Sequence, residues 1–269
     1  MEISEKRLKV SGKWKVLINE ALCKGGLAEA VISAIEGKGS EALKRLKSSE
    51  TSRVWKFGFG GVDYAVKEFL GRGFFEPIKT RFKGTRAMRA WKGGRLLLEN
   101  GFKTPPLVME IEGPGARNFL VTAFVDDVTG LFTLSRELAK KGGAEASRIR
   151  RRCARALGDT VGRMHALGLV HGDLRLENIL IKGAEHGRCE LFFIDNERNV
   201  KYPRRPPIDK IEWNLVQISM VLVPDADRAA CFAAYLKRMP ELKARKTELG
   251  SKVMATARKR IEKKHGRSI

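Results

Sequence analysis

Residues 170–181, VHGDLRLENILI, place polar side chains that can do chemistry among apolar residues typical of strands. Asp173 follows His171 by two positions, and Asn178 follows Asp173 by five. Transfer of a phosphoryl group needs a carboxylate that orients and deprotonates the acceptor hydroxyl, ligands for metal ions, and a cation on the phosphates. Asp173 can be that carboxylate, and Asn178, at the far end of the same loop, can hold a metal ion.

Two further residues complete this set in the right chain order. Lys67, in the strand-like run DYAVKEF, can supply the cation, and Asp195, at the end of CELFFID, can hold the metals that bridge the phosphates. A bare His-x-Asp-x4-Asn pattern arises by chance in on the order of one in a hundred chains of this length. Together with the strand-borne lysine and the second aspartate, it favours phosphoryl transfer over a helix-capping Asp173, a turn Asn178 and a surface Lys67.

Periodicity and turn residues predict the elements that must position these side chains. VWKF and DYAVKEF indicate two strands joined at GFGG, residues 58–61, in an antiparallel hairpin, and KWKVLINEAL adds a further stretch of β-formers. Residues 80–100 predict a helix that stops at Gly101, and residues 118–125 a strand. Between residues 146 and 167 apolar side chains recur every three or four positions, which predicts a helix with one buried stripe: Ile149, Cys153, Leu157, Val161 and Met164.

These motifs resemble a known family. HGDLRLEN, FFIDNE and YAVKEF are similar to the signatures of the protein-kinase-like fold. RAWKGGRLLLENGFKTPP resembles the lipopolysaccharide kinase family, bacterial enzymes that phosphorylate Kdo or heptose in the inner core of lipopolysaccharide. The resemblance, from about residue 14 to residue 220, implies an α+β, bilobal fold. We expect an N-terminal antiparallel sheet lobe with one helix (residues 1–121), a hinge (122–127) and a mainly helical C-terminal lobe (128–269).

The resemblance also implies ATP and Mg as cofactors and assigns residue roles. Asp173 is then the base, Lys67 the cation on the α- and β-phosphates, and Asn178 and Asp195 the metal ligands. DNE replaces the Asp-Phe-Gly triplet of protein kinases, so the glycine hinge of a switching activation loop is missing. This departure favours a sugar or small-molecule kinase.

For the other parts of the nucleotide site, the sequence gives weaker evidence. Backbone groups of Ala123 to Val125 should bind adenine at the hinge. The serine-rich KSSETS segment, with Ser48, Ser49 and Ser52, either covers the phosphates or is a plain polar hairpin turn.

The carboxylate partner of Lys67 stays open between Glu76, Glu99 and the nucleotide phosphates themselves. His171 should support the loop by packing and hydrogen bonding, and His165 should be structural.

The charge balance is strongly basic. Lys and Arg number 53 against 31 Asp and Glu, a net charge of +22, which implies an anionic partner. Lipopolysaccharide intermediates and the anionic cytoplasmic face of the inner membrane fit the resemblance, and nucleic acid does not. The C-terminal segment SKVMATARKRIEKKHGR should form a basic helix that either lies on the membrane or is solvated.

The four cysteines (Cys23, Cys153, Cys189 and Cys231) form no C-x-x-C pair, so neither a zinc knuckle nor a disulfide framework is predicted. MEISEKRLKV lacks the apolar stretch of a secretory signal, and the apolar runs are too short to span a bilayer. We expect a cytoplasmic protein that is peripheral to the inner membrane.

Two other functions are compatible with these residues. One is an atypical protein kinase or antibiotic phosphotransferase on the same fold. The other is an inert, basic binding protein with a kinase-like fold, against which the intact Lys67, Asp173, Asn178 and Asp195 argue. The sequence leaves open the sugar, the hydroxyl, the oligomeric state and the mode of membrane contact.

Overall fold

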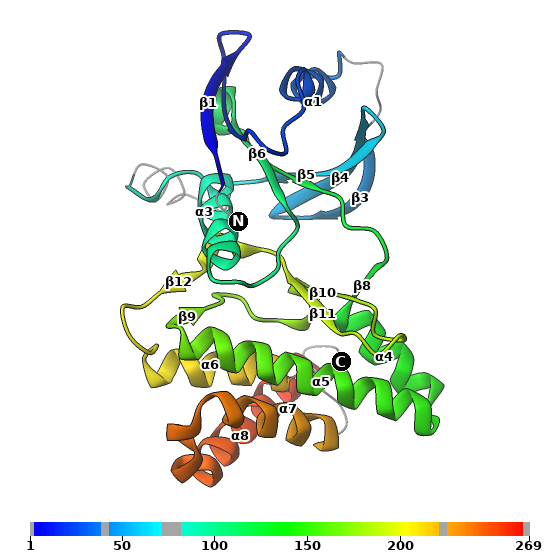
Figure 1. Ribbon diagram of the computed structural model, residues 1–269, viewed down its shortest axis with the longest axis vertical. Helices are drawn as coiled ribbons and strands as arrows, with labels where there is room; N and C mark the ends of the chain where they lie inside the picture. Colours follow the sequence, from blue (N-terminus) through cyan, green and yellow to red (C-terminus); the bar gives the residue numbers. More distant parts are fainter. Residues whose placement is uncertain (1–2, 39–42, 72–81, 221–224, 266–269) are drawn as a thin grey trace. The chain divides into compact units, whose positions relative to one another are not determined.

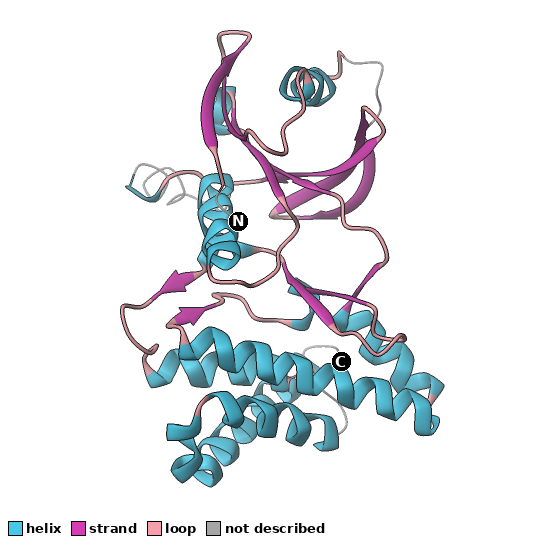
Figure 2. Ribbon diagram, viewed as in Figure 1, coloured by secondary structure: helices cyan, strands magenta, loops and turns pink. Residues whose placement is uncertain are grey.

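The computed structural model describes residues 3–38, 43–71, 82–220 and 225–265. The chain divides into two compact units, Met1–Asp126 and Asp127–Ile269. This division falls inside the segment 122–127 that the sequence indicates as a hinge. Strands make up most of the first unit and helices most of the second (Figure 2).

The first unit is built on a seven-stranded sheet in the order β1-β2-β6-β7-β5-β4-β3, with every neighbouring pair antiparallel (Figure 1). Its elements are β1 (Glu5–Val10), β2 (Trp14–Asn19), α1 (Leu27–Ile35), β3 (Lys44–Ser49), β4 (Ser52–Phe59), β5 (Val62–Phe69), α3 (Arg86–Glu99), β6 (Leu107–Glu112), η1 (Pro114–Ala116) and β7 (Asn118–Ala123).

The predicted hairpin at GFGG is confirmed as β4–β5. Phe59 pairs with Val62, so Gly60 and Gly61 alone make the turn, and both have positive φ, 57° and 73°. A two-residue turn with two positive φ angles matches the twist of the strands and strongly favours glycine at both positions. The hairpin places β5 between β4 and β7, and Lys67 faces Val54 on one side and Leu120 on the other.

One helix packs on each face of this sheet. Helix α1, which the sequence patterns did not predict, covers one face with Leu27, Val31 and their neighbours. Helix α3 covers the other with Trp91 and Ala87 (Figure 1). The predicted helix at residues 80–100 is thus observed over Arg86–Glu99.

The second unit is mainly helical (Figure 1). It also has a small sheet in the order β11-β10-β8 and a separate pair, β12-β9. Its elements are β8 (Val128–Gly130), α4 (Leu131–Lys141), α5 (Gly143–Ala166), β9 (Leu169–Val170), η2 (Leu176–Asn178), β10 (Ile179–Lys182), β11 (Glu190–Phe193), η3 (Asn196–Arg198), β12 (Val200–Lys201), α6 (Ile208–Ser219), α7 (Asp225–Arg238), η4 (Pro240–Arg245) and α8 (Lys246–His265).

Helix α5 carries the core of this unit. The apolar stripe predicted from its sequence is confirmed, because all five of its members are buried. Gly158 and Gly162 lie against α7, where a Cβ would come within 2.0 Å of the Cys231 carbonyl oxygen and 2.9 Å of the Tyr235 carbonyl oxygen, respectively. Glycine at these two positions therefore lets α5 and α7 pack at unusually close range.

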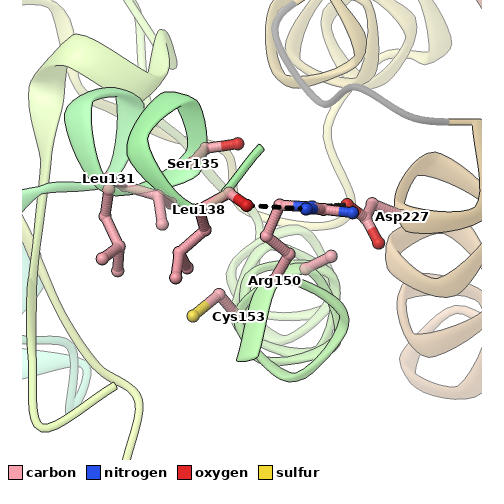
Figure 3. Close-up of a pocket in the computed structure, with 8 residues that line it drawn as sticks. Leu131, Ser135, Leu138, Arg150, Cys153 and Asp227 are labelled. Carbon is pink, nitrogen blue, oxygen red and sulfur yellow. Dashed lines mark hydrogen bonds and ion pairs between the residues drawn. The ribbon is translucent and has the colours of Figure 1, made fainter. Parts of the chain in front are cut away.

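A buried ion pair joins α5 and α7 beside a pocket lined by α4 (Figure 3). Arg150 Nε donates to Asp227 Oδ2 at 3.0 Å, and Arg150 Nη1 donates to the Leu138 carbonyl at 3.1 Å. The two side chains are only 10% and 4% exposed. Because a buried charge is costly unless it is paired, each partner depends on the other.

Helix α8 packs against α6 with its apolar residues, since Leu249, Val253 and Ala257 are buried. Arg260 lies 4.1 Å from the ring of Trp213, and Lys252 pairs with Glu212 at 2.6 Å. The predicted C-terminal helix is therefore present, and its apolar face is used inside the unit. Within the described ranges, no helix has both the length and the apolar character needed to cross a bilayer.

Candidate active site

Two strand pairs hold the segment that contains Asp173, Asn178 and Asp195. At its base, Val170 in β9 pairs with Val200 in β12. Above it, β10 and β11 pair from Ile179 and Phe193 onwards. The Ile194 amide donates to the Asn178 carbonyl at 2.9 Å, which extends this pairing by one step. The backbone of Asp195 therefore lies next to that of Asn178.

Gly172 allows the two halves of the segment to meet. A Cβ at this position would lie 2.2 Å from Cβ and 2.3 Å from the carbonyl oxygen of Arg198. Such distances are far below van der Waals contact, so only glycine fits without a shift of the backbone. Gly172 thus packs the loop of Asp173 directly onto the segment that carries Asp195.

The carboxylate of Asp173 has two partners. Arg175 forms a bidentate pair with it, from Nε to Oδ1 at 2.8 Å and from Nη2 to Oδ2 at 2.7 Å. Gln217 Nε2 donates to Oδ1 at 3.2 Å. The carboxylate also raises the pKa of the Arg175 guanidinium. Asp173 is thereby oriented from α6 and from its own loop, while its side chain is still 22% exposed.

A buried polar network supports Gln217. Gln217 Oε1 accepts from the Leu174 amide and from Asn214 Nδ2, both at 3.1 Å, and Asn214 Nδ2 also donates to the His171 carbonyl at 2.8 Å. Asn214 Oδ1 meets His165 Nε2 at 3.1 Å, and His165 Nδ1 meets the Tyr235 hydroxyl at 3.0 Å. Burial lowers the pKa of His165 to about 4, so it is neutral at pH 7. His165 is structural, as predicted.

His171 also has the structural contacts that were predicted. Its ring is fully buried, and Nδ1 accepts from the Asp173 amide at 3.3 Å. The ring lies 5.8 Å from that of Phe193, centroid to centroid. Burial lowers the pKa of the imidazole. His171 therefore connects the catalytic loop to β11.

Asn178 and Asp195 offer a donor set that suits Mg. Asn178 Nδ2 donates to the Asp173 carbonyl at 2.9 Å, which fixes the side-chain amide. Asp195 has left-handed backbone angles, φ 63° and ψ 48°, at the start of η3. No group of three or more His, Cys, Asp or Glu side chains within the described ranges could hold a metal ion. Mg bound mainly by phosphates needs only one or two protein oxygens, so one carboxylate and one amide fit it.

Lys67 belongs to the first unit. Its Nζ lies 4.9 Å from the centroid of the Phe69 ring, and the Arg86 guanidinium lies 5.0 Å from the same ring. Of the proposed carboxylate partners, Glu99 is at the end of α3 and pairs with Arg95 at 3.0 Å. Glu76 lies outside the described residues. Glu99 therefore pairs with Arg95, and the structure does not test whether Glu76 pairs with Lys67.

The serine-rich segment forms the tight turn between β3 and β4. Ser49 Oγ accepts from the Thr51 amide at 3.3 Å and from the Ser52 amide at 3.1 Å, and Ser48 Oγ accepts from Arg45 at 2.7 Å. These amides are thus engaged within the turn. Arg86 Nη1 donates to the Thr51 carbonyl at 2.8 Å, which ties the turn to the start of α3. This geometry favours the polar hairpin over an open phosphate cradle.

The adenine-binding prediction rests on the end of β7. The Ala123 amide donates to the Pro106 carbonyl at 2.8 Å, and the Phe124 amide donates to the Asp63 carbonyl at 2.9 Å. Ala123 and Phe124 therefore already use their N–H groups inside the first unit. Val125 follows the strand, and its role stays a prediction.

Sequence reasoning missed two residues that contact Asp173. Arg175 is within the quoted motif, two positions after Asp173, and a cation so near the carboxylate was a usable signal. Gln217 is 44 positions away, and nothing local marks it. Only packing of α6 beneath the loop reveals its contact.

Comparisons with known proteins agree with this geometry. The profile of the Lipopolysaccharide kinase (Kdo/WaaP) family matches residues 40–235. No curated protein sequence matches the chain. A solved structure of WaaP in complex with acyl carrier protein is similar over 88% of this chain and 97% of that chain, with a TM-score of 0.63 and 20% identity. A crystal structure of WbdD matches 74% of this chain and 46% of that chain, with a TM-score of 0.48 and 16% identity.

The likeness to WaaP concerns the fold, and it confirms the predicted α+β, protein-kinase-like architecture. The family profile covers most of the chain, including Lys67, Asp173, Asn178 and Asp195. The chain therefore belongs to the lipopolysaccharide kinase (Kdo/WaaP) family and is a phosphotransferase that acts on a sugar hydroxyl.

Proposed function

We propose that this protein transfers the γ-phosphate of ATP to a hydroxyl of Kdo or heptose in the inner core of lipopolysaccharide. The observation that carries the proposal is the strand-locked segment that brings Asp173, Asn178 and Asp195 together. Such a segment supplies an acceptor-orienting carboxylate and metal ligands from one rigid element. Family membership supplies the class of acceptor.

In this mechanism Asp173 orients the sugar hydroxyl and takes its proton as the hydroxyl attacks. Gln217 keeps Oδ1 in place, and Arg175 holds both carboxylate oxygens before substrate arrives. The Arg175 side-chain is half exposed, at 54%, so it can turn from Asp173 toward the transferred phosphoryl group. There its charge would offset the negative charge that develops on the phosphate oxygens.

Asn178 and Asp195 would hold Mg, and Lys67 would contact the α- and β-phosphates of ATP. When bound, Mg neutralises phosphate charge and aligns the γ-phosphoryl group with the hydroxyl. The backbone of Val125, which follows β7, would bind adenine, because the N–H groups of Ala123 and Phe124 already donate inside the first unit. We assign nucleotide binding to residues 1–121, the hinge to 122–127, and acceptor binding to 128–269.

The basic excess supports a site of action at the cytoplasmic face of the inner membrane. Attraction to anionic lipid contributes about 1 kcal/mol per basic residue close to the surface and weakens with salt. Because α8 buries its apolar residues against its own unit, contact would be made by its outward Lys and Arg residues. Sedimentation with anionic vesicles, lost in high salt and absent with zwitterionic vesicles, tests this part.

The same charge supports binding of an acidic protein. The related WaaP was solved with acyl carrier protein, and a net charge of +22 would attract a partner with an acidic surface. We infer that an acyl carrier protein binds this chain as well. Co-purification from a mixture with purified acyl carrier protein, at low and at high salt, measures it directly.

The decisive experiment is transfer of radiolabelled γ-phosphate from ATP and Mg to purified inner-core lipopolysaccharide acceptors. Asp173→Asn keeps the shape of the side chain and removes its charge, so we expect turnover to fall about 10²–10⁴-fold with ATP binding retained. Asp209→Asn is the control, because Asp209 is an exposed acid that forms an ion pair with its neighbour Lys210 at 2.8 Å.

The acceptors separate the rival functions. Label on generic protein but not on glycolipid would favour an atypical protein kinase. Bound ATP with no label on any acceptor would favour the inert binding protein. Unchanged turnover by Asp173→Asn would remove Asp173 from the mechanism.

A further inference from the structure

The structure brings two cysteines together that are 36 positions apart in the sequence. Sγ of Cys153, on α5, lies 3.7 Å from Sγ of Cys189, which directly precedes β11. Both are free thiols. Cys153 is buried and lines the pocket between α4, α5 and α7 (Figure 3). Cys189 is partly exposed, so it is the more accessible of the two residues.

The surroundings make the two sulfurs chemically unequal. The two thiols hydrogen-bond to each other, and this contact, together with the positive charge of Arg152, lowers the pKa of Cys189. The same hydrogen bond and burial raise the pKa of Cys153. Thiolates are the reactive form of cysteine, so Cys189 is the sulfur that reacts first.

Cys189 lies between a turn that contains two glycines and strand β11. It follows a turn in which the Arg188 amide donates to the Gly183 carbonyl at 2.9 Å, and Gly183 and Gly187 both have positive φ. A disulfide needs the sulfurs at about 2.05 Å. The remaining approach can come from this turn, while Cys153 stays within the packed helix α5.

We propose that Cys153 and Cys189 form a reversible redox site that peroxide converts to an intramolecular disulfide. The Cys189 thiolate attacks one oxygen of hydrogen peroxide, which gives a sulfenic acid and hydroxide. The sulfur of Cys153 then attacks the Cys189 sulfur, an S–S bond forms, and the hydroxyl leaves with the Cys153 proton as water. In total, two thiols are oxidised, one peroxide is reduced, and two waters are released.

The proposed disulfide would join α5, which leads into the loop of Asp173, to β11, which leads into Asp195. Helix α5 leads into β9, and β11 leads into Asp195 six residues after Cys189. A disulfide here would fasten the start of β11 to α5. The inference does not depend on the proposed function, since bond formation is measured without phosphoryl transfer.

The test uses the full chain, titrated with hydrogen peroxide, blocked with an alkylating agent and digested with trypsin without reduction. Cleavage at arginine releases Cys153 in residues 153–155 and Cys189 in residues 189–198. We expect these two peptides joined, about 2 Da lighter than their sum. Two thiols should become unreactive and return with dithiothreitol. Absence of the joined peptide while Cys189 is oxidised to sulfinic acid would overturn the proposal.

Cysteine variants test whether Cys189 is oxidised first and Cys153 then reacts with it. Cys153→Ala should leave a sulfenic acid on Cys189 that dimedone labels, because no second thiol resolves it. Cys189→Ser, at a partly exposed position, should abolish both the joined peptide and the label. Cys231→Ser, on α7, is the matched control and should behave as the wild type. Dimedone on Cys153 instead of Cys189, or a joined peptide that contains Cys231 or Cys23, would contradict the assignment.

Discussion

Gln217 bridges the side chain and the backbone of the catalytic loop. Its Nε2 donates to Asp173 Oδ1 at 3.2 Å, and its Oε1 accepts from the Leu174 amide at 3.1 Å. Gln217 is only 5% exposed and is itself held by Asn214. The direction of the Asp173 carboxylate is thus set from α6, far away in sequence. Gln217 is a positioning residue, since it acts through Asp173.

Gln217→Glu should separate this positioning from nucleotide binding. The new carboxylate can still accept from the Leu174 amide, but it faces Asp173 with a negative charge and no donor. We expect kcat to fall about 10- to 100-fold, as for other displaced catalytic groups, with KM for ATP within about two-fold. Steady-state kinetics measures the split. Ser219→Ala, on the same helix, is the control, and an equal rise in KM would indicate a general loss of structure.

Gly172→Ala should damage the site by a steric route. The added methyl group would overlap Arg198, so the loop of Asp173 and the segment of Asp195 must move apart. We expect a loss of on the order of 2 kcal/mol in the free energy of unfolding and a larger relative loss in kcat. Gly25→Ala has open space around its Cβ and an ordinary φ, so it should change neither. Denaturant unfolding and turnover, measured on both variants, decide the point.

Asp227→Ala should be among the most destabilising changes in the second unit. It leaves the Arg150 guanidinium buried without its carboxylate, at a cost of about 3–5 kcal/mol in the free energy of unfolding. Arg150→Met combined with Asp227→Leu removes both charges and should cost clearly less than Asp227→Ala. Urea unfolding of the two variants measures these free energies. If the double variant is as unstable as Asp227→Ala, lost packing and not the unpaired charge causes the destabilisation.

The buried side chain of Glu110 should make the free energy of unfolding depend on pH. This side chain, in β6, is 2% exposed and accepts from Thr85 Oγ1 at 3.1 Å. Burial raises its pKa to about 8, with a further rise from Glu112. The folded protein therefore holds a proton that the unfolded chain releases above about pH 4.5, and stability falls as the pH rises from 5 through 8.

Glu110→Gln mimics the protonated acid and keeps the acceptor for Thr85. Near pH 9 we expect the free energy of unfolding of this variant to exceed that of the wild type by about 5 kcal/mol, whereas near pH 4 the two values should agree. Thermal unfolding across this pH range measures the difference. Glu137→Gln, at an exposed position on α4, is the control, and a gap of constant size at every pH would exclude titration of Glu110 as its cause.

Local patterns predicted the elements whose sequences carry their own signals. The β4–β5 hairpin has two glycines with the required positive φ, and the stripe on α5 repeats at the helical period. Strand β3, KRLKSS, is exposed at every position and has no alternation, so only its pairing with β4 defines it. Helix α1 was not predicted, since it is only nine residues long and its N-cap, Gly26, offers no side-chain capping hydrogen bond.

Local sequence patterns likewise predicted only part of the candidate site. Asp173 and Asn178 are joined by one short loop, and Asp195 closely follows the second of the two strands after it, so residue types and chain order predicted them as a group. The contacts of Gln217 and the approach of Cys153 to Cys189 depend on how helices pack, which one sequence does not reveal. The sequence left the serines open between a phosphate cover and a polar hairpin turn, and the hydrogen bonds by which Ser49 closes its own turn became visible only in the structure.

The pairing of Val170 with Val200 closes the residues between them into one loop with a two-stranded base. Asp173, Asn178 and Asp195 all lie within that loop, so none can leave its place by independent fraying. Backbone amides of this region should exchange with deuterium together, in one cooperative opening, instead of in separate steps. The chain thus keeps Asp173, Asn178 and Asp195, and the spacing between them, as a single unit that is either wholly assembled or wholly open.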